Sequence, residues 1–575
     1  MITKLVFILS YLVFFVGLTI FKKTDQKLNI VRYLIFQIML TMIFNVVLMT
    51  ILYLFGVGMA PMFASSVLGI IGVALIIIAL KKKQFQKYEF RWIDLVASLL
   101  IAGVAFAVGI KLFGPDLHLA YNNADPAVHF FMTQDALING NHSSMFFNEI
   151  NNALAINGMS IFTDSSFLNY KLYIIIEICM LAFSGLMFYT LASQWAKKNT
   201  HNLICAVIAI FYLLGYSLNN TIYGFGYLGV AVTLICFTII LCKSLWDGII
   251  GLKKFMPLMS MCAFCNAMCY VLFAPLVWLI IAAIVFCYGR KNKFKFKKIL
   301  LVETAIFALP LILVIKFYYF DFLLTEQMDV EDQIRTNGAH YAYYIKNAIL
   351  FLPMAIYALI QNIRKKKSFV TTFFFISWMI FFMLSVIARE FGMISPYYCS
   401  KMYHVAWLVT FIMSADGTVQ LLQRIPKTVI AYGVVVSALI ASAFFNRGGP
   451  LVDIYRFNFS WVRLHETIGE QTMEGYRFAS DEIVNKGEKI VWATNLRRYD
   501  RAYWFYGLQV IETNKCDYCG AWNYDATGLE NNMKENKVNY IGIFKLDPES
   551  YAPYTSLLKD KKPIFENNEV AIYKY

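Results

Sequence analysis

An aspartate and a histidine four residues apart, Asp125 and His129, are the strongest candidates in this sequence for acid-base chemistry. In a helix, residues at this spacing lie on one face. The carboxylate could take a proton from a hydroxyl group, with the imidazole orienting it or sharing the proton, or it could hold a divalent ion. The simpler alternative is that Asp125 only caps a helix and that His129 is an interfacial side chain.

A second group of polar residues lies between 389 and 404. It combines two cations with a phenol and an imidazole: Arg389, Lys401, Tyr398 and His404. They stand at adjoining ends of two apolar runs, where cationic and hydroxyl groups could bind a phosphate at the level of lipid headgroups. Alternatively they are ordinary interface anchors, because aromatic and basic residues are common at the ends of membrane spans.

The sequence around Asp125 predicts the helix that carries it. Asp125 suits the N-cap, Pro126 suits the first helical position and Gly140 suits the end. The residues that would share its apolar face are Val128, Phe131, Met132 and Leu137. A helix this short cannot span a bilayer, so we expect it to lie along the outer membrane surface.

The composition indicates a membrane protein. Of the 575 residues, 59% are hydrophobic and 15% are charged, and the mean hydropathy is +0.58. Apolar runs of about 18 to 25 residues recur, each long enough to cross a hydrocarbon core of roughly 30 Å. The net charge of +15 does not indicate a nucleic-acid partner, because the lysines and arginines gather in short clusters between these runs.

We predict an α-helical polytopic membrane protein with about fourteen transmembrane helices. The predicted spans are 2–20, 30–56, 61–80, 93–113, 170–195, 202–217, 226–245, 255–270, 272–288, 299–319, 344–362, 369–388, 402–419 and 428–445. The pair around Pro275 could also be one re-entrant pair. The positive-inside rule places the basic clusters in the cytoplasm and the N-terminus outside. Glu177 then lies about two turns into the fifth span, close to the outer face.

The chain divides into two predicted domains. Residues 1–446 form a transmembrane domain that includes a large external loop at 114–169, and residues 447–575 form an extracytoplasmic C-terminal α/β domain. The boundary is where long apolar runs give way to mixed charge and alternating patterns. The predicted elements of the second domain are strands at 489–494 and 539–545, a helix at 473–485 and a hairpin at 563–575.

Zinc and nucleotide motifs are weak or missing from the sequence. Cys516 and Cys519 are more simply a local disulfide or two free thiols, because a zinc site normally needs four ligands and no second pair follows. The sequence has no GxxxxGK[ST] loop. The energy for any group transfer must therefore come from an activated donor.

This layout resembles the GT-C class of integral-membrane glycosyltransferases, which includes protein O-mannosyltransferases and the lipid A aminoarabinose transferase. The resemblance covers the whole chain, and it implies a polyprenyl-phosphate sugar as the donor. Asp125 is similar in position to the loop aspartate that serves that class as base or metal ligand, and Lys401 and Arg389 resemble the basic residues that hold the lipid phosphate. The chain departs from the class where Pro126, rather than a second acid, follows Asp125, and in having two extra N-terminal spans.

We therefore predict transfer of a sugar from a polyprenyl phosphate to an envelope glycan, lipid or protein acceptor, in the plasma membrane of a bacterium. Asp125 would activate the acceptor hydroxyl and His129 would orient it or share the proton. The lipid phosphate would meet Lys401, Arg389, Tyr398 and His404. A divalent cation, Mg or Mn, held by Asp125 is an option. The alternatives are a lipid-linked glycan flippase or other transporter, which would need a hydrophilic path between helices, and a polysaccharide polymerase.

Overall fold

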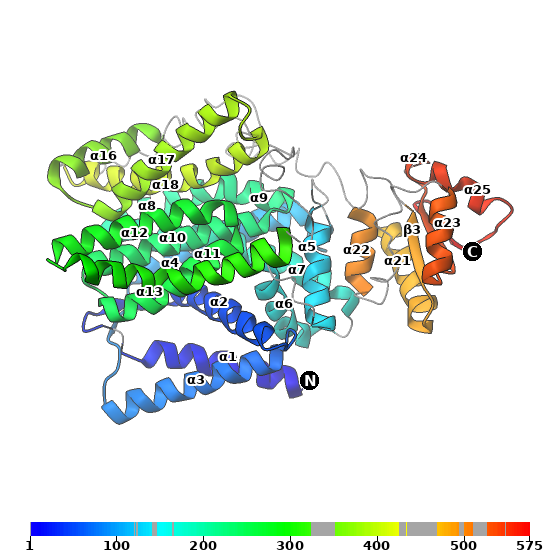
Figure 1. The fold of residues 1–575 in the computed structure, drawn as a ribbon, viewed down its shortest axis with the longest axis horizontal. Coiled ribbons are helices and arrows are strands. Elements are labelled where there is room, and N and C mark those ends of the chain that lie inside the picture. The colour runs from blue at the N-terminus through cyan, green and yellow to red at the C-terminus, as the bar shows by residue number, and fades with distance from the viewer. Residues whose placement is uncertain are drawn as a thin grey trace.

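The computed structural model describes residues 2–323, 351–424, 468–493, 500–509 and 526–575 together with Gly433, except for residues 23, 120, 122–124, 141–146, 164–165 and 547. These residues contain eleven helices long and apolar enough to cross a membrane. The chain is therefore a multi-pass membrane protein. Figure 1 shows the helices as one bundle, with a smaller C-terminal region at the end where the N-terminus also lies.

The long helices follow the predicted apolar runs. They are α1 (Ile2–Ile20), α2 (Ile30–Leu54), α3 (Pro61–Lys82), α4 (Trp92–Phe113), α7 (Asn169–Ala192), α8 (Asn199–Tyr212) continued by α9 (Leu218–Tyr223), α10 (Gly226–Trp246), α12 (Ala274–Lys291), α13 (Phe296–Val314), α17 (Phe369–Glu390) and α18 (Pro396–Leu422). Hydrophobic runs of this length fold as helices in lipid because the helix satisfies every backbone hydrogen bond internally.

Two other predicted spans correspond to shorter helices. The run 255–270 is α11 (Leu252–Cys269), and the run 344–362 overlaps α16 (Leu352–Lys365). The chain turns at residues 270–273, just before Pro275, so α11 and α12 are two separate helices that pack together. The predicted span 428–445 and the cysteines Cys516 and Cys519 lie outside the described residues.

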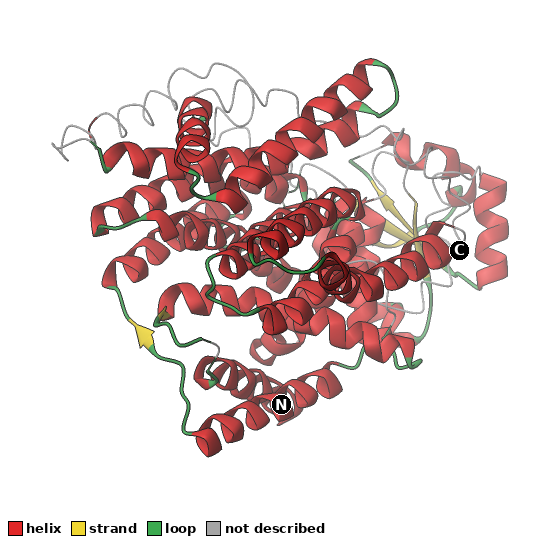
Figure 2. Ribbon diagram, turned by 60° about the vertical axis from the view of Figure 1, so that its left-hand side comes forward, coloured by secondary structure: helices red, strands yellow, loops and turns green. Residues whose placement is uncertain are grey.

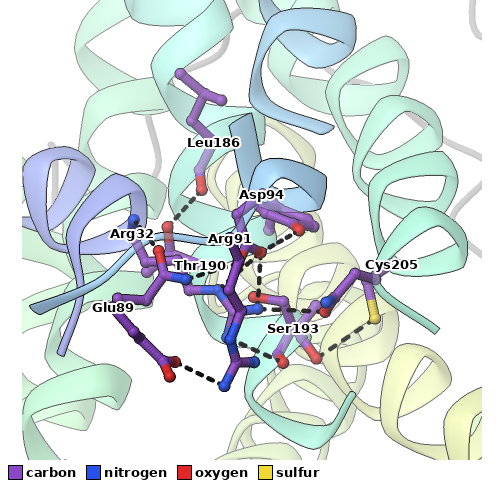
Figure 3. Close-up of polar contacts among 12 residues, drawn as sticks. Arg32, Glu89, Arg91, Asp94, Leu186, Thr190, Ser193 and Cys205 are labelled. Carbon is purple, nitrogen blue, oxygen red and sulfur yellow. Dashed lines mark hydrogen bonds and ion pairs between the residues drawn. The ribbon is translucent and has the colours of Figure 1, made fainter. Parts of the chain in front are cut away.

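A buried ion pair ties four helices together at the end of the bundle where α2, α4 and α8 begin and α7 ends (Figure 3). Oδ1 of Asp94 accepts hydrogen bonds from Arg32 Nε at 3.0 Å, Arg32 Nη2 at 2.7 Å and the Tyr189 hydroxyl at 2.6 Å. Its Oδ2 accepts one from Asn29 at 2.7 Å. Arg32 also donates to the Ser193 carbonyl and to Asn202, so both charges are fully hydrogen-bonded.

Two shorter helices, α5 (Asp125–Asn139) and α6 (Phe147–Met159), lie at the opposite end, between the bundle and the C-terminal region (Figure 1). Helix α5 ends as predicted at Gly140, which has a φ of 69° and whose carbonyl accepts the Met59 N–H at 2.9 Å. The predicted apolar face is wrong in part. The side chains that α5 buries are Pro126, Ala127, Phe130, Thr133, Gln134 and Ala136, because the helix packs between α6 and the C-terminal region.

The C-terminal region contains a four-stranded sheet of β3 (Ile490–Ala493), β4 (Tyr540–Phe544), β5 (Pro563–Glu566) and β6 (Val570–Lys574). Its order is β3-β4-β6-β5, with β3 and β4 parallel and the other pairs antiparallel. Figure 2 shows these strands gathered beside the helices. The predicted strands, the final hairpin and the helix, here α21 (Glu470–Glu482), are confirmed.

The C-terminal region packs on the helix that begins at Asp125. Its contact is α22 (Asp500–Gln509), which lies along α5. The Trp504 ring lies 5.1 Å from the Phe130 ring and 6.0 Å from the Tyr121 ring, and Tyr503 meets Phe131 at 5.7 Å. Aromatic pairs at these distances hold the two helices together.

Candidate functional site

Asp125 and His129 both lie on the first turns of α5, as their spacing predicts. Nδ1 of His129 is 2.6 Å from Oε1 of Glu149, a residue of the neighbouring helix α6. Glu149 is buried, with 2% of its side chain exposed, and His129 is partly buried, with 13% exposed. The structure thus supplies a carboxylate that orients the imidazole, an arrangement typical of acid-base sites.

The charge of Glu149 decides how His129 titrates. Burial by itself lowers the pKa of His129, but the negative charge and hydrogen bond of Glu149, with smaller contributions from Asp125 and Glu177, raise that pKa above its ordinary value of 6.5. The imidazolium form is therefore favoured, and His129 and Glu149 act as an ion pair that faces the Asp125 carboxylate.

Lys401 lies on the first turns of α18, and its side chain is fully buried. Nζ sits 3.8 Å from the centre of the Phe225 ring, 4.5 Å from that of Tyr397 and 5.8 Å from that of Tyr227. Among the described residues, Nζ donates no hydrogen bond. The ammonium group is therefore held by aromatic faces, without the oxygen ligands that a buried cation normally has.

The fold brings Asp125 and Lys401 together from distant parts of the chain. Asp125 is the charged group that acts on Lys401, and it also acts on the neighbouring Tyr397 hydroxyl. The His129 ring contacts Tyr227 at 4.8 Å, which is one of the three rings around Lys401. The predicted base and the predicted phosphate ligand thus share one cluster, which we call the outer cluster: Asp125, His129, Glu149 and Lys401 with Phe225, Tyr227 and Tyr397.

His404 lies one turn after Lys401 and is also buried. Its Nδ1 is 3.3 Å from the amide nitrogen of Asn220, on α9, and its ring contacts Tyr216 at 4.7 Å. His404 therefore links α18 to the kinked α8–α9 segment. The half-buried Tyr398 contacts Tyr397 edge to face, with ring centres 4.9 Å apart, and so lies next to the outer cluster.

Arg389 is not brought to the outer cluster. It is at the end of α17, where its guanidinium pairs with the adjacent Glu390, Nε lying 3.0 Å from Oε1. Its further electrostatic partners are Tyr403 and Cys399, and no contact between the described residues links it to Asp125 or Lys401. Its neighbouring acid compensates its charge. Lys401 is therefore the cation of the outer cluster that has no hydrogen-bond partner among the described residues.

Sequence reasoning did not assign a role to Glu149, Phe225 or Tyr227. Glu149 was visible only as one acid in a loop without lysine or arginine, and its pairing with His129 depends on how α6 lies against α5. Phe225 and Tyr227 belong to a short polar and aromatic stretch that is more simply interpreted as a turn than as a contact for a sugar ring. Their role around Lys401 follows from the contact of this turn with α18.

The donor set gives little support to a metal ion. Among the described residues, no group of three His, Cys, Asp or Glu side chains is placed to hold one. Asp125 has His129 as its nearest titratable neighbour on α5, and the Nδ1 of that ring is engaged by Glu149. We therefore derive no chemical step through a metal.

No family model and no curated protein matches this sequence. Several solved structures are similar to it at low identity. The archaeal oligosaccharyltransferase AglB from Archaeoglobus fulgidus, in complex with an inhibitory peptide and a dolichol-phosphate, is 10% identical, with a TM-score of 0.46 over 80% of this chain and 70% of that chain. Apo ArnT from Cupriavidus metallidurans is 12% identical, with a TM-score of 0.45 over 83% and 97%. ArnT bound to undecaprenyl phosphate is 10% identical, with a TM-score of 0.40 over the same shares.

With TM-scores of 0.40–0.46, this likeness assigns no activity to the chain. At identities of 10–12%, no residue of this chain takes its role from them. What the outer cluster can do follows from its own geometry.

Proposed function

We propose that this chain is a glycosyltransferase that moves a sugar from a polyprenyl-phosphate donor to an envelope glycan, lipid or protein acceptor at the outer face of the plasma membrane. The observation that carries the proposal is the buried ammonium group of Lys401 at the start of a span, which lacks a hydrogen-bonded oxygen among the described residues. Asp125 is near enough to act on its charge. Desolvated cations are stabilised by bound anions. The phosphate of a membrane lipid is the anion that reaches the end of a span.

The outer cluster supplies the groups that such a transfer needs. The Asp125 carboxylate takes the proton of the acceptor hydroxyl as its oxygen attacks the anomeric carbon of the donor. The bond between that carbon and the phosphate oxygen breaks, and the electron pair leaves with the phosphate. The Lys401 ammonium stabilises the charge that develops there. The His129–Glu149 pair keeps the first turn of α5 in place, and the rings of Phe225, Tyr227 and Tyr397 offer flat apolar faces for a sugar.

The position of the C-terminal region agrees with an acceptor that enters at the end of the bundle where the outer cluster lies. We propose that residues 447–575 form a domain outside the cytoplasm and that residues 1–446, with the loop 114–169, form the transmembrane domain of a bacterial enzyme. The contact of α22 with α5 supports this proposal, because the C-terminal region packs on the helix that carries Asp125. A domain there could select the acceptor while the bundle holds the donor.

The test is donor turnover. The purified chain in detergent is given radiolabelled polyprenyl-phosphate sugars and a membrane extract as acceptor, and the release of free polyprenyl phosphate is measured. Loss of one general base is expected to lower turnover by about 10²- to 10⁴-fold in Asp125→Asn. The matched control is Asp135→Asn, because Asp135 lies on the same helix and bonds to Asn139, away from Lys401. Full turnover in Asp125→Asn would remove Asp125 from the mechanism. A folded wild-type protein inert with every donor would favour transport.

A further inference from the structure

A small cavity lined by both polar and apolar residues lies inside the bundle between α7, α9 and α10. It measures about 10 Å³, and its polar lining consists of Glu177, Ser184, Ser217, Asn220 and Thr221, with Gly226 and Gly229 of α10 closing one side. A volume of ~10–15 Å³ on this scale is the room needed by one water molecule. The cavity therefore fits a single occupant of that size.

Two oxygens in this cavity lack a hydrogen bond. Oε2 of Glu177 and Oδ1 of Asn220 are fully buried, and neither accepts a hydrogen bond from another described residue. The amide nitrogen of Asn220 is directed to His404, which leaves its oxygen free on the other side of the amide. The Glu177 carboxylate lies so close to Gly226 that an added Cβ would overlap it. The absence of a side chain at Gly226 thus leaves space at the Glu177 carboxylate.

The charge of Glu177 is not balanced by the protein around it. Its charged neighbours are His129 and Glu149, which act on it with opposite signs and are already paired with each other. Its other titratable neighbours are the hydroxyls of Tyr121 and Tyr173, which are neutral donors at best. A carboxylate buried within a span is costly unless it binds a cation or a proton.

We propose that this cavity is a sodium-ion site. All of its polar lining atoms that can act as ligands are oxygens, from a carboxylate, an amide and three hydroxyls, and oxygen-only sets suit hard cations. One carboxylate balances one positive charge, which favours a monovalent ion over calcium or magnesium. The water-sized space favours sodium over the larger potassium ion. The site is independent of the proposed transfer reaction, although Asn220 links it to His404 and so to the turn that carries Lys401.

The test measures stability and binding, so that it does not depend on activity. The full chain in detergent is heated while a thiol-reactive dye detects exposure of the buried cysteines, such as Cys236, Cys262 and Cys265. Sodium chloride is titrated against choline chloride and potassium chloride at constant ionic strength. An ion that binds only the folded state raises the unfolding temperature, here by roughly 2–4 °C and saturably, with sodium alone. Equilibrium binding of radioactive sodium should show the same midpoint.

Two variants locate the ion, each with a matched control. Glu177→Gln removes the charge, and Gly226→Ala fills the cavity, so both should abolish the sodium-specific shift and the binding of radioactive sodium. The controls are Glu303→Gln, a half-buried glutamate within α13, and Gly103→Ala, where an added Cβ meets nothing within 4 Å; both should retain the response. A wild-type protein that responds equally to sodium, potassium and choline overturns the proposal. So does a sodium response that survives both cavity variants.

Discussion

The two ends of the bundle each bury charged residues, and they compensate the charge in opposite ways. In the Arg32–Asp94 pair, every carboxylate oxygen has a donor and the guanidinium reaches two further acceptors (Figure 3). In the outer cluster, Lys401 Nζ has aromatic rings around it and no hydrogen-bond acceptor among the described residues. A fully hydrogen-bonded ion pair fixes the positions of helices, whereas a buried cation without a hydrogen-bond acceptor can bind an anion.

The two kinds of buried charge should respond differently when one charged residue is replaced. Removing one partner of a satisfied buried pair leaves an isolated charge, and stability falls. Removing a cation that has no partner relieves a desolvation cost, so that stability should hold or rise while any ligand that needed the cation is lost. The comparison therefore predicts opposite results for similar substitutions at the two ends.

The largest effect is expected at the satisfied end. Arg32→Met leaves Asp94 buried without its cation and should lower the free energy of unfolding by about 3–5 kcal/mol. The control is Arg91→Met, because Arg91 pairs with Glu89 at 2.6 Å on the surface, where such pairs contribute about 0–1 kcal/mol. Denaturant titration of both variants in detergent measures the difference. Adding Asp94→Leu to Arg32→Met should recover most of the loss, and equal costs for the two arginines would contradict the comparison.

The second largest effect is expected at the outer cluster, where a substitution should reduce activity without reducing stability. Lys401→Met should lower donor turnover by about 10²- to 10³-fold, the range for losing one group that stabilises developing negative charge. Its unfolding temperature should equal or exceed that of the wild type, because methionine suits the aromatic surroundings without a charge. Lys171→Met, at the start of α7 beside the Tyr170 ring, is the matched control and should keep its turnover. A lower unfolding temperature in Lys401→Met than in the wild type would show that Lys401 stabilises the fold.

A smaller effect concerns the pH dependence of the His129–Glu149 pair. Because the pKa of His129 is raised in the folded chain, its contribution to stability is fully present below the ordinary value of 6.5 and is lost as the pH rises through the raised pKa. Glu149→Gln should therefore lower the unfolding temperature most at mildly acidic pH and least at alkaline pH. Thermal scans across this range test the sign, with Asp135→Asn expected to follow the wild-type profile. A constant difference at all pH values would mean that the pair carries no charge.

The smallest effect is expected from removing one of the aromatic rings that contact Lys401. Phe225→Leu removes the nearest ring, at 3.8 Å from Nζ, and should weaken the binding of polyprenyl phosphate by about 2- to 5-fold, as for loss of a cation–π contact of roughly 0.5–1 kcal/mol. The same substitution in Lys401→Met should have no such effect, because the cation is already gone. An undiminished effect in the double variant would show that Phe225 contacts the ligand by itself.

Local sequence determined the helices and strands, because each depends on neighbours in the chain. The apolar runs became the spans within a few residues at each end, and Asp125, Pro126 and Gly140 marked the limits of α5. The final hairpin turns at Asn567, whose side-chain oxygen accepts the N–H groups of Glu569 and Val570 at 2.9 Å. Hydropathy, capping and turn chemistry are all short-range signals, so they can be read without a fold.

Only the tertiary structure decided which of the candidate residues meet. Arg389 and Lys401 are equivalent candidates in the sequence, yet Arg389 pairs with Glu390 while Lys401 is buried among aromatic rings. Glu149 became the partner of His129, and Glu177 came to face Asn220 across a cavity, through the packing of helices that are distant in the chain. Periodicity shows which face of a helix is apolar, but it does not say which helix lies against that face. The chemistry of the outer cluster depends on that choice of neighbours.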